Sequence, residues 1–391
     1  MQDQYSDIRP YHDEEVRRVI QRLTRARTLQ HALVKYRFPA LPAWLRQALL
    51  PLAGWYLRRR TAHIHTVESF QRWLAPWIAS LLKQSSDDIV VRGLEHLSSE
   101  KSYLWISNHK DIAMDPTLIN YSLHHVGWPT SRIAIGDNLL GHPDVADIMR
   151  LNKSFVVKRS VANKREKLRE LQKLSAYIRT SLESGHSIWI AQREGRAKDG
   201  IDRTDTAVLK MLALNGRERG ENFTATMTAM RPVPVSIQYE WDPCDVQKAQ
   251  ELVTRAETGR YEKSLDEDTR SILLGLTGAK GRIYVDFGHP LSAAELASAD
   301  DMAQAIDLQL QQMCEILPVQ QSALYLLQQE YSLATEYDCS GVDTVTHKKL
   351  LRRLEGLDHA VRQRLLQTYA APLLQKVAAE NAEQQQSGSI E

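Results

Sequence analysis

Hydrophobic positions divide the chain into three stretches with different periods. Up to about residue 85, apolar residues recur at helical spacing, as Val16, Ile20 and Leu23 do. From residue 86, short β-branched runs such as SYLWISN, SFVVKRS and SIWIAQ alternate with helical segments. After residue 318 helical spacing returns. We therefore predict a helical N-terminal region (1–85), an α/β domain (86–317) and a helical C-terminal region (318–391) that ends in a disordered tail.

The middle stretch contains a β-α-β unit. Between SFVVKRS and SIWIAQ lies a long segment whose apolar residues, among them Leu171, Ile178 and Leu182, mark one helix face. Gly185 suits the end of that helix. Such a unit implies parallel strands and a right-handed crossover. The predicted fold class is α/β, with a mixed, mostly parallel sheet flanked by helices and with helical N- and C-terminal extensions.

Tryptophans are concentrated in the N-terminal region. Trp44, Trp55, Trp73 and Trp77 lie close in sequence to the three arginines at 58–60. This composition suits helices at a membrane interface. A helical cap on a soluble core, with the arginines extending along apolar surface to water, explains it equally well.

Composition excludes several classes of protein. The 50 basic and 48 acidic residues leave a net charge of +2, which does not favour a general nucleic-acid binder. Three cysteines without metal-binding spacing indicate a reducing compartment and no disulfides. The first ten residues are too polar for a signal peptide. The most apolar segment, 41–57, contains Arg46 and two prolines, so we predict no transmembrane helix.

His109 is a candidate for chemistry because it directly follows a predicted strand in the segment WISNHKDIAMDPTLINY. Ligands of α/β proteins gather at such strand ends. Asp111 or Asp115 could fix the tautomer of His109 and stabilise the imidazolium that forms when it takes a proton. Both also have structural interpretations, since Asp115 before Pro116 suits a helix N-cap and Asp111 suits a turn. The chain has no GxSxG sequence, so His109 would activate a substrate hydroxyl rather than a protein nucleophile.

Basic residues follow two of the predicted strands. Lys158 and Arg159 end one strand, and Arg193, Arg196 and Lys198 lie at the end of another. Cationic side chains at neighbouring strand ends are typical of a phosphate site, although solvated surface charge explains any single one of them.

Four segments, in order, resemble the motifs of the glycerolipid acyltransferase superfamily, which includes the glycerol-3-phosphate and 1-acylglycerol-3-phosphate acyltransferases. NHKDIAMD resembles the NHxxxxD motif, and IGDNLL with LNKSFVVKRS resembles the second motif. WIAQREGRAKDG resembles the third motif, built around Glu-Gly, and RPVPVSI the fourth. The resemblance covers roughly residues 88–291.

The resemblance implies transfer of a fatty acyl group from acyl-CoA or acyl carrier protein to a hydroxyl of glycerol 3-phosphate or 1-acylglycerol 3-phosphate, in phospholipid synthesis. It assigns His109 as general base, with an aspartate that orients it. It implies an acceptor phosphate bound by residues of the second and third motifs, for which the candidates are Lys158, Arg159, Arg193, Glu194, Gly195, Arg196 and Lys198. It implies no metal and no cofactor beyond the acyl donor. We expect a cytoplasmic protein, peripheral at the inner face of the cell membrane.

The chain departs from the family pattern twice. The family aspartate lies five residues after the histidine, where this chain has Met114, and the carboxylates lie two and six residues after it. A turn with one extra residue would keep Asp115 at the helix start, so we predict Asp115 as the orienting residue and Asp111 as the alternative. In the third motif Ala197 occupies the usual arginine position, and Gln192-Arg193 replaces the usual Phe-Pro.

These departures leave two alternatives to the glycerol-phosphate acyltransferase. One is an acyltransferase for a different lysolipid or alcohol acceptor. The other is a catalytically silent membrane-surface protein that binds lipid.

Overall fold

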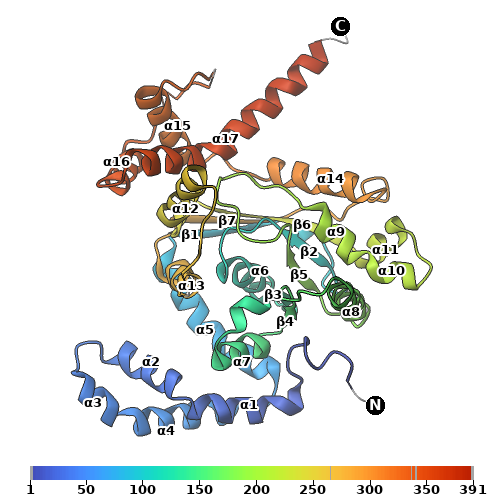
Figure 1. Cartoon of the computed structure of the whole chain (residues 1–391), viewed down its shortest axis with the longest axis vertical. Coiled ribbons are helices and arrows are strands. Elements are labelled where there is room, and N and C mark those ends of the chain that lie inside the picture. Colours follow the sequence, from blue (N-terminus) through green and yellow to red (C-terminus); the bar gives the residue numbers. More distant parts are fainter. Residues whose placement is uncertain (1–2, 265, 336, 340, 389–391) are drawn as a thin grey trace. The chain divides into compact units, whose positions relative to one another are not determined.

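The computed structural model describes residues 3–264, 266–335, 337–339 and 341–388 (Figure 1). In this part of the chain seven strands form one sheet in the order β1-β7-β6-β2-β5-β3-β4. The strands are β1 (Asp88–Arg92), β2 (Leu104–Ser107), β3 (Arg132–Gly136), β4 (Ser154–Val157), β5 (Ile188–Ala191), β6 (Pro232–Tyr239) and β7 (Arg282–Phe287).

The sheet is mixed and mostly parallel. The pairs β1–β7, β2–β6 and β3–β4 are parallel, whereas β6 and β7 are antiparallel. The predicted α/β class with a mixed, mostly parallel sheet is confirmed. Strands β2 and β6 are buried along their whole length. This explains their continuous apolar runs, since strands of a sheet that is covered on both faces lack polar alternation.

Helices precede, connect and follow these strands. The N-terminal ones are α1 (Asp13–Arg25), α2 (Arg27–Arg37), α3 (Ala43–Ala48), α4 (Leu50–Thr61) and α5 (Val67–Ser85). Between the strands lie α6 (Met114–His125), α7 (Pro143–Leu151), α8 (Lys164–Glu183), α9 (Thr206–Leu212), α10 (Leu214–Glu218), α11 (Phe223–Met230), α12 (Asp245–Thr258) and α13 (Glu267–Thr277), with the short 3₁₀ turns η1 (Leu94–His96) and η2 (Asp137–Leu140). After β7 come α14 (Ala299–Gln312), α15 (Pro318–Tyr331), α16 (Thr344–Leu354) and α17 (His359–Gly388).

The chain folds as two compact units, each made of segments that are far apart in sequence. The first unit comprises residues 1–80 and 130–188. Its core joins Val16, Val19 and Ile20 of α1 to Leu151 of α7. The N-terminal segment is tied to β4, because the Val156 N–H donates to the Ile8 carbonyl oxygen at 2.8 Å.

The second unit comprises residues 81–129 and 189–391. Its C-terminal helices form a core of their own, which includes Leu324, Leu350, Leu365 and Leu366. Helices α15 and α17 pack together, and α17 also packs on α12 (Figure 1). The C-terminal helices are therefore an integral part of the second unit.

The structure differs from the sequence-based expectation at the C-terminus. Helix α17 continues to Gly388 through most of the segment that we expected to be disordered. Ala, Glu and Gln predominate in that segment, and these residues have high intrinsic helix propensity. The last three residues, 389–391, lie outside the described residues. Among the described residues, no helix has both the length and the apolar character needed to cross a membrane.

Candidate functional site

The candidate site is built around the loop between β2 and α6. Asn108, which is buried, anchors the start of this loop to β6. Its amide oxygen accepts from the Ile237 N–H at 2.9 Å, and its amide nitrogen donates to the Ile237 carbonyl at 3.0 Å and to Asp202 at 2.9 Å. His109 is therefore held in the strand-to-helix turn, as predicted.

Asp115 is the carboxylate that contacts His109. Its Oδ2 lies 2.8 Å from Nδ1 of His109 and also accepts the backbone N–H groups of Lys110 and Asp111 at 2.7 and 2.9 Å. Its Oδ1 accepts from the Tyr239 hydroxyl at 2.7 Å. The Asp115 side chain is fully buried, so water does not compete for these bonds. The structure thus brings together His109 and the aspartate that we predicted to orient it.

Our prediction that Asp115 caps α6 was wrong. Helix α6 begins at Met114 after the N-cap residue Ala113, so Asp115 already lies inside the first turn and its carboxylate reaches back into the loop. Asp111 provides the capping acceptor, because its Oδ1 accepts the N–H groups of Ala113 and Met114 at 3.0 and 2.8 Å. Burial, and then the nearby charge of Asp115, raise the pKa of Asp111. The helix starts two residues earlier than it would with Asp115 as its N-cap, and the two aspartates divide the roles of capping and of contacting the histidine.

The His109 ring is fixed from two further sides. Its side chain is 15% exposed, and it meets the Trp189 ring edge to face with centroids 5.8 Å apart. Trp189 is itself held by a 2.9 Å bond from its Nε1 to Ser107. With Nδ1 directed at Asp115, Nε2 is the ring atom that can take a proton from a substrate.

The third-motif loop lies directly against His109. The Ala197 N–H donates to the His109 carbonyl oxygen at 2.7 Å, and the Gln192 N–H at the end of β5 donates to the Ser107 carbonyl at 2.8 Å. Gly200 has a φ of +78° and approaches α17 so closely that an added Cβ would overlap the Thr368 carbonyl oxygen. The loop is therefore fixed between the turn that contains His109 and the C-terminal helices.

The predicted basic residues of this loop differ in their hydrogen bonds and ion pairs. The Lys198 ammonium is paired with buried Glu251, which also pairs with Arg255 at 2.7 Å, and burial lowers the pKa of Lys198. Arg196 donates to Ser271 at 3.3 Å, while its Nη1 is buried without a hydrogen-bond partner among the described residues. Among the candidates of the third motif, Arg196 thus has a buried donor without a hydrogen-bond partner among the described residues. Arg193 is partly exposed, and Glu194 and Gly195 are exposed.

Lys158 and Arg159 belong to the first unit. Lys158 forms ion pairs with Asp7 at 2.6 Å and with Glu170 at 3.0 Å. Burial lowers the pKa of Lys158, but the bonds that it donates to Asp7 and Glu170, together with the charges of these carboxylates, outweigh that effect, and the pKa is raised. The backbone N–H of Arg159 donates to Asp137 at 3.2 Å. Lys158 is therefore committed to tying the N-terminal segment to α8, a contact that no sequence signal indicated.

Tyr239 is a residue of this site that the sequence did not reveal. It ends the strand formed by the fourth-motif segment and lies 124 positions after Asp115. The register between strands β2 and β6 is the signal that would have identified Tyr239. Strand β2 pairs in parallel with β6, with Ser107 opposite Val235, so residues just beyond Val235 lie beside the loop that follows β2.

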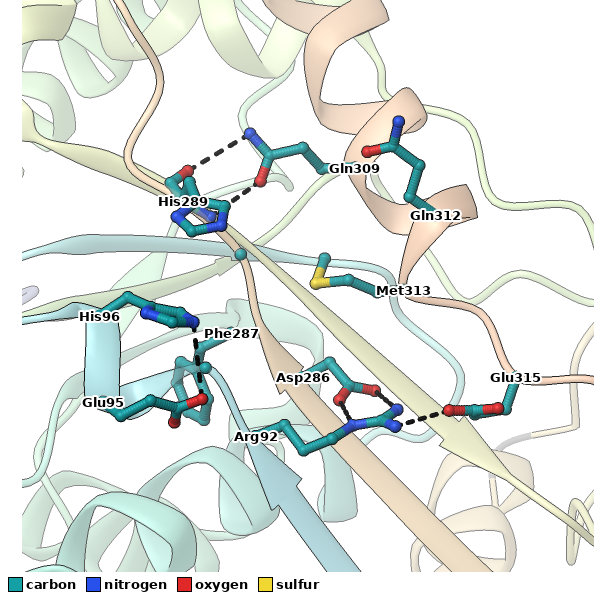
Figure 2. A pocket seen from close by; sticks show the side chains of 12 residues that line it. Arg92, Glu95, His96, Asp286, Phe287, His289, Gln309, Gln312, Met313 and Glu315 are labelled. Atoms are coloured by element: carbon teal, nitrogen blue, oxygen red, sulfur yellow. Dashed lines mark hydrogen bonds and ion pairs between the residues drawn. The ribbon is translucent and has the colours of Figure 1, made fainter. Parts of the chain in front are cut away.

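A pocket lies elsewhere in the second unit, where β1 and β7 end (Figure 2). Its volume, including space open to solvent, is about 810 Å³. Figure 2 shows Arg92 directed at Asp286 and at Glu315, the latter at 2.6 Å. Because β7 is antiparallel to β6 while β2 is parallel to it, this pocket lies at the opposite end of the strands from the β2–α6 loop. It does not contain any of the predicted site residues.

The described residues contain no group of three or more His, Cys, Asp and Glu side chains that could hold a metal ion.

Residues 88–220 match the family model described as Acyltransferase. Among solved structures, the chain is similar to the 1-acyl-sn-glycerophosphate (LPA) acyltransferase PlsC from Thermotoga maritima, with 16% identity over 74% of this chain and 96% of that chain, at a TM-score of 0.40. A TM-score this low does not establish a common fold. No curated protein matches the chain.

Proposed function

We propose that this chain, whose residues 88–220 match the Acyltransferase family model, is a glycerolipid acyltransferase that acylates a hydroxyl of glycerol 3-phosphate or 1-acylglycerol 3-phosphate. The acyl donor is the thioester of CoA or of acyl carrier protein. The observation that carries this proposal is the 2.8 Å contact between His109 and the buried carboxylate of Asp115 inside the matched segment.

In the proposed reaction, the acceptor hydroxyl gives its proton to Nε2 of His109 while its oxygen bonds to the thioester carbonyl carbon. The carbon–sulfur bond then breaks, and the departing sulfur takes the proton from His109 to leave as a thiol. Asp115 accepts the Nδ1–H of His109 and offsets the positive charge of the imidazolium between these steps. The low exposure of both side chains strengthens this interaction, because little water screens it.

Arg196 is our candidate for the acceptor phosphate. It directly precedes Ala197, whose N–H is bonded to the His109 carbonyl, and its Nη1 has no partner among the described residues. Guanidinium groups bind phosphate through paired N–H donors. Arg193 at the same loop is the second candidate, whereas the ion pairs of Lys158 and Lys198 make those lysines weaker candidates.

The test is an assay of thiol release from acyl-CoA and from acyl carrier protein, with and without glycerol 3-phosphate or its 1-acyl derivative. We expect release only when an acceptor is present, with an acylated product detected by mass spectrometry. His109→Ala should abolish the reaction. Acyl transfer that persists in this variant would exclude the mechanism, and vesicle binding without turnover on any acceptor would favour the silent lipid-binding alternative.

A second candidate function has a different acceptor, such as another lysolipid or an alcohol. It is supported by Ala197, which occupies the family's arginine position and is buried, so this side chain contributes no charge to a phosphate site. A panel of acceptors tests it. Preference for an acceptor without phosphate, together with full activity of Arg196→Gln, would reverse the ranking of the two functions.

We also propose that the first unit binds a membrane surface through α2–α4. Between Glu15 and Glu68 the chain has no acidic residue, and α2–α4 carry seven basic ones: Arg27, Lys35, Arg37, Arg46, Arg58, Arg59 and Arg60. The same helices expose Tyr36 (72%), Trp44 (70%) and Trp55 (52%). Exposed aromatic rings among cations are typical of helices that insert into the headgroup region of anionic bilayers. A lipid acceptor or product would then be close to its enzyme.

A further inference from the structure

Asp115 is held at both of its oxygens, and different parts of the chain hold them. Oδ2 accepts from His109 and from two backbone N–H groups of its own loop. Oδ1 accepts from Tyr239, its partner among the described residues. Tyr239 is 8% exposed and Asp115 is fully buried, so solvent offers no ready substitute for this bond.

Strand β6 fixes the position of the Tyr239 hydroxyl. The register that places Ser107 opposite Val235 brings the end of β6 to the level of the β2–α6 loop. The two bonds between Asn108 and Ile237 then extend this pairing to within two residues of Tyr239. The Tyr239 hydroxyl is thus positioned by a buried strand, β6, and not by a surface loop.

We propose that Tyr239 is a positioning residue that holds Asp115, and through it His109, in the geometry needed for proton transfer. This inference rests on the proposed function for its catalytic meaning, and Tyr239 acts through its bond to Asp115. A carboxylate bonded at Oδ2 alone would rotate more freely, and the histidine would lose its fixed direction. A phenol that donates to Oδ1 also withdraws charge from the carboxylate, so it tempers the attraction that Asp115 exerts on the imidazolium.

Tyr239 remains a donor throughout the working range of pH. Burial, and then the charge of Asp115, raise its pKa well above the ordinary value of a tyrosine. The hydroxyl therefore keeps its proton under conditions in which the enzyme is active.

The test compares Tyr239→Phe with a matched control, Tyr369→Phe. Tyr369 is also 8% exposed and donates to a carboxylate, Asp245, at 2.7 Å. Both variants lose one buried hydroxyl and one bond to an aspartate carboxylate, and Tyr369→Phe also loses the bond from the Asp242 N–H at 3.1 Å, so the control carries at least the structural cost of Tyr239→Phe. They differ in the carboxylate that loses its phenol donor, which is Asp115 in Tyr239→Phe and Asp245 in Tyr369→Phe.

Two readouts are needed, and the first does not depend on activity. In the NMR spectrum, the imidazole Nδ1–H signal of His109 is identified by its absence in His109→Ala. We expect Tyr239→Phe to move this signal and to raise the pH at which it titrates, because the carboxylate with one donor fewer attracts the protonated ring more strongly. Tyr369→Phe should leave both unchanged.

The second readout is the pH profile of acyl transfer. We expect Tyr239→Phe to lower kcat by roughly tenfold with little change in KM, and to move the acidic limb to higher pH. A fraction of misfolded enzyme would lower kcat equally at all pH values and would not move the limb. Replacement of Tyr239 by 3-fluorotyrosine, a stronger donor, should move the limb in the opposite direction and keeps the side chain in place.

An unchanged Nδ1–H signal and an unchanged acidic limb in Tyr239→Phe would overturn the proposal, as would equal changes in Tyr369→Phe. If wild-type protein transfers no acyl group while the NMR signal responds as expected, the proposed function fails and the link from Tyr239 to His109 stands.

Discussion

The β2–α6 loop and the α2–α4 helices use polar and aromatic side chains in opposite ways. In the loop, Asn108 and Asp115 are buried, and each makes three or more hydrogen bonds. In the helices, Trp44 and Trp55 are exposed among cations that no acidic residue of the same segment neutralises. The polar groups of the loop are hydrogen-bonded within the protein, whereas the aromatic side chains of the helices are exposed and can contact another surface, such as a membrane. A change in the loop should therefore affect catalysis, whereas a change in the helices should affect binding alone.

The largest expected effect separates the two aspartates of the loop. Asp115→Asn should lower kcat by roughly 10³- to 10⁴-fold, because an amide cannot accept the Nδ1–H of His109 in the same way and favours the wrong tautomer. Steady-state kinetics at the pH optimum measures this.

Asp111→Asn is the matched control, since asparagine caps helices about as well as aspartate. We expect its activity to remain within about tenfold of wild type. If Asp111→Asn lost activity while Asp115→Asn kept it, Asp111 would be the orienting residue and our assignment would be reversed.

The second prediction tests how tightly the third-motif loop is held. Gly200→Ala should destabilise the protein by about 2–4 kcal/mol, from the positive φ and the overlap with the Thr368 carbonyl together. Thermal or denaturant unfolding measures it, and the activity of the folded variant should fall as well.

Gly220→Ala provides the control, because Gly220 has a φ of +72° but no atom within 4 Å of an added Cβ. Its cost should be that of the backbone alone, about 1–2 kcal/mol. Equal destabilisation of the two variants would show that α17 does not restrain the loop.

The third prediction concerns the exposed helices. The double variant Trp44→Ala/Trp55→Ala should bind vesicles that contain anionic lipid at least about tenfold more weakly, with stability and activity on soluble substrates nearly unchanged. Co-sedimentation with anionic and zwitterionic vesicles measures this. Leu273→Ala, which removes an exposed apolar side chain from the second unit, should bind as wild type does. If the wild type, the double variant and Leu273→Ala all bound equally, the membrane proposal would be excluded and these tryptophans would be interpreted as part of a helical cap.

The smallest expected effect comes from the N-terminal segment. Lys158 and Lys173 hold Asp7 as a carboxylate and lower its pKa to about 2, against the opposing effect of burial. Because the folded-state pKa lies below the ordinary value of 3.8, the stabilisation is present above about pH 4 and is lost as pH falls towards 2. Asp7→Asn should thus cost at most about 1 kcal/mol at pH 7, since these groups are partly exposed, and nothing near pH 2. A cost that is the same at both pH values would rule out the ion pairs as its origin.

The sequence predicted those parts of the candidate site whose residues lie close together in the chain. The strand before His109, the turn that contains it and the nearby Asp115 lie within one short segment, and the structure brings the two side chains together. The capping role was assigned to the wrong aspartate because Asp-Pro suits a helix start, and only the length of the turn decides which carboxylate reaches the free N–H groups.

The contacts that the sequence did not predict join residues far apart in the chain. Tyr239 reaches Asp115 through the register of two strands, and Asp7 reaches Lys158 across 151 positions. Lys198 likewise pairs with Glu251 on α12, which lies 53 positions away in the sequence. Periodicity and motif spacing carry no information about such pairs, since these depend on how the elements pack.

The bonds of β6 have a consequence for how this enzyme can be cut or fused. A fragment that ends where the family match ends, at residue 220, would contain His109 and Asp115 but neither Ile237 nor Tyr239. Asn108 and Asp115 would then lose partners that lie beyond the fragment. A portable module that keeps Asn108 and Asp115 with their partners, whether in a gene fusion or in an expression plasmid, must therefore extend at least through Tyr239.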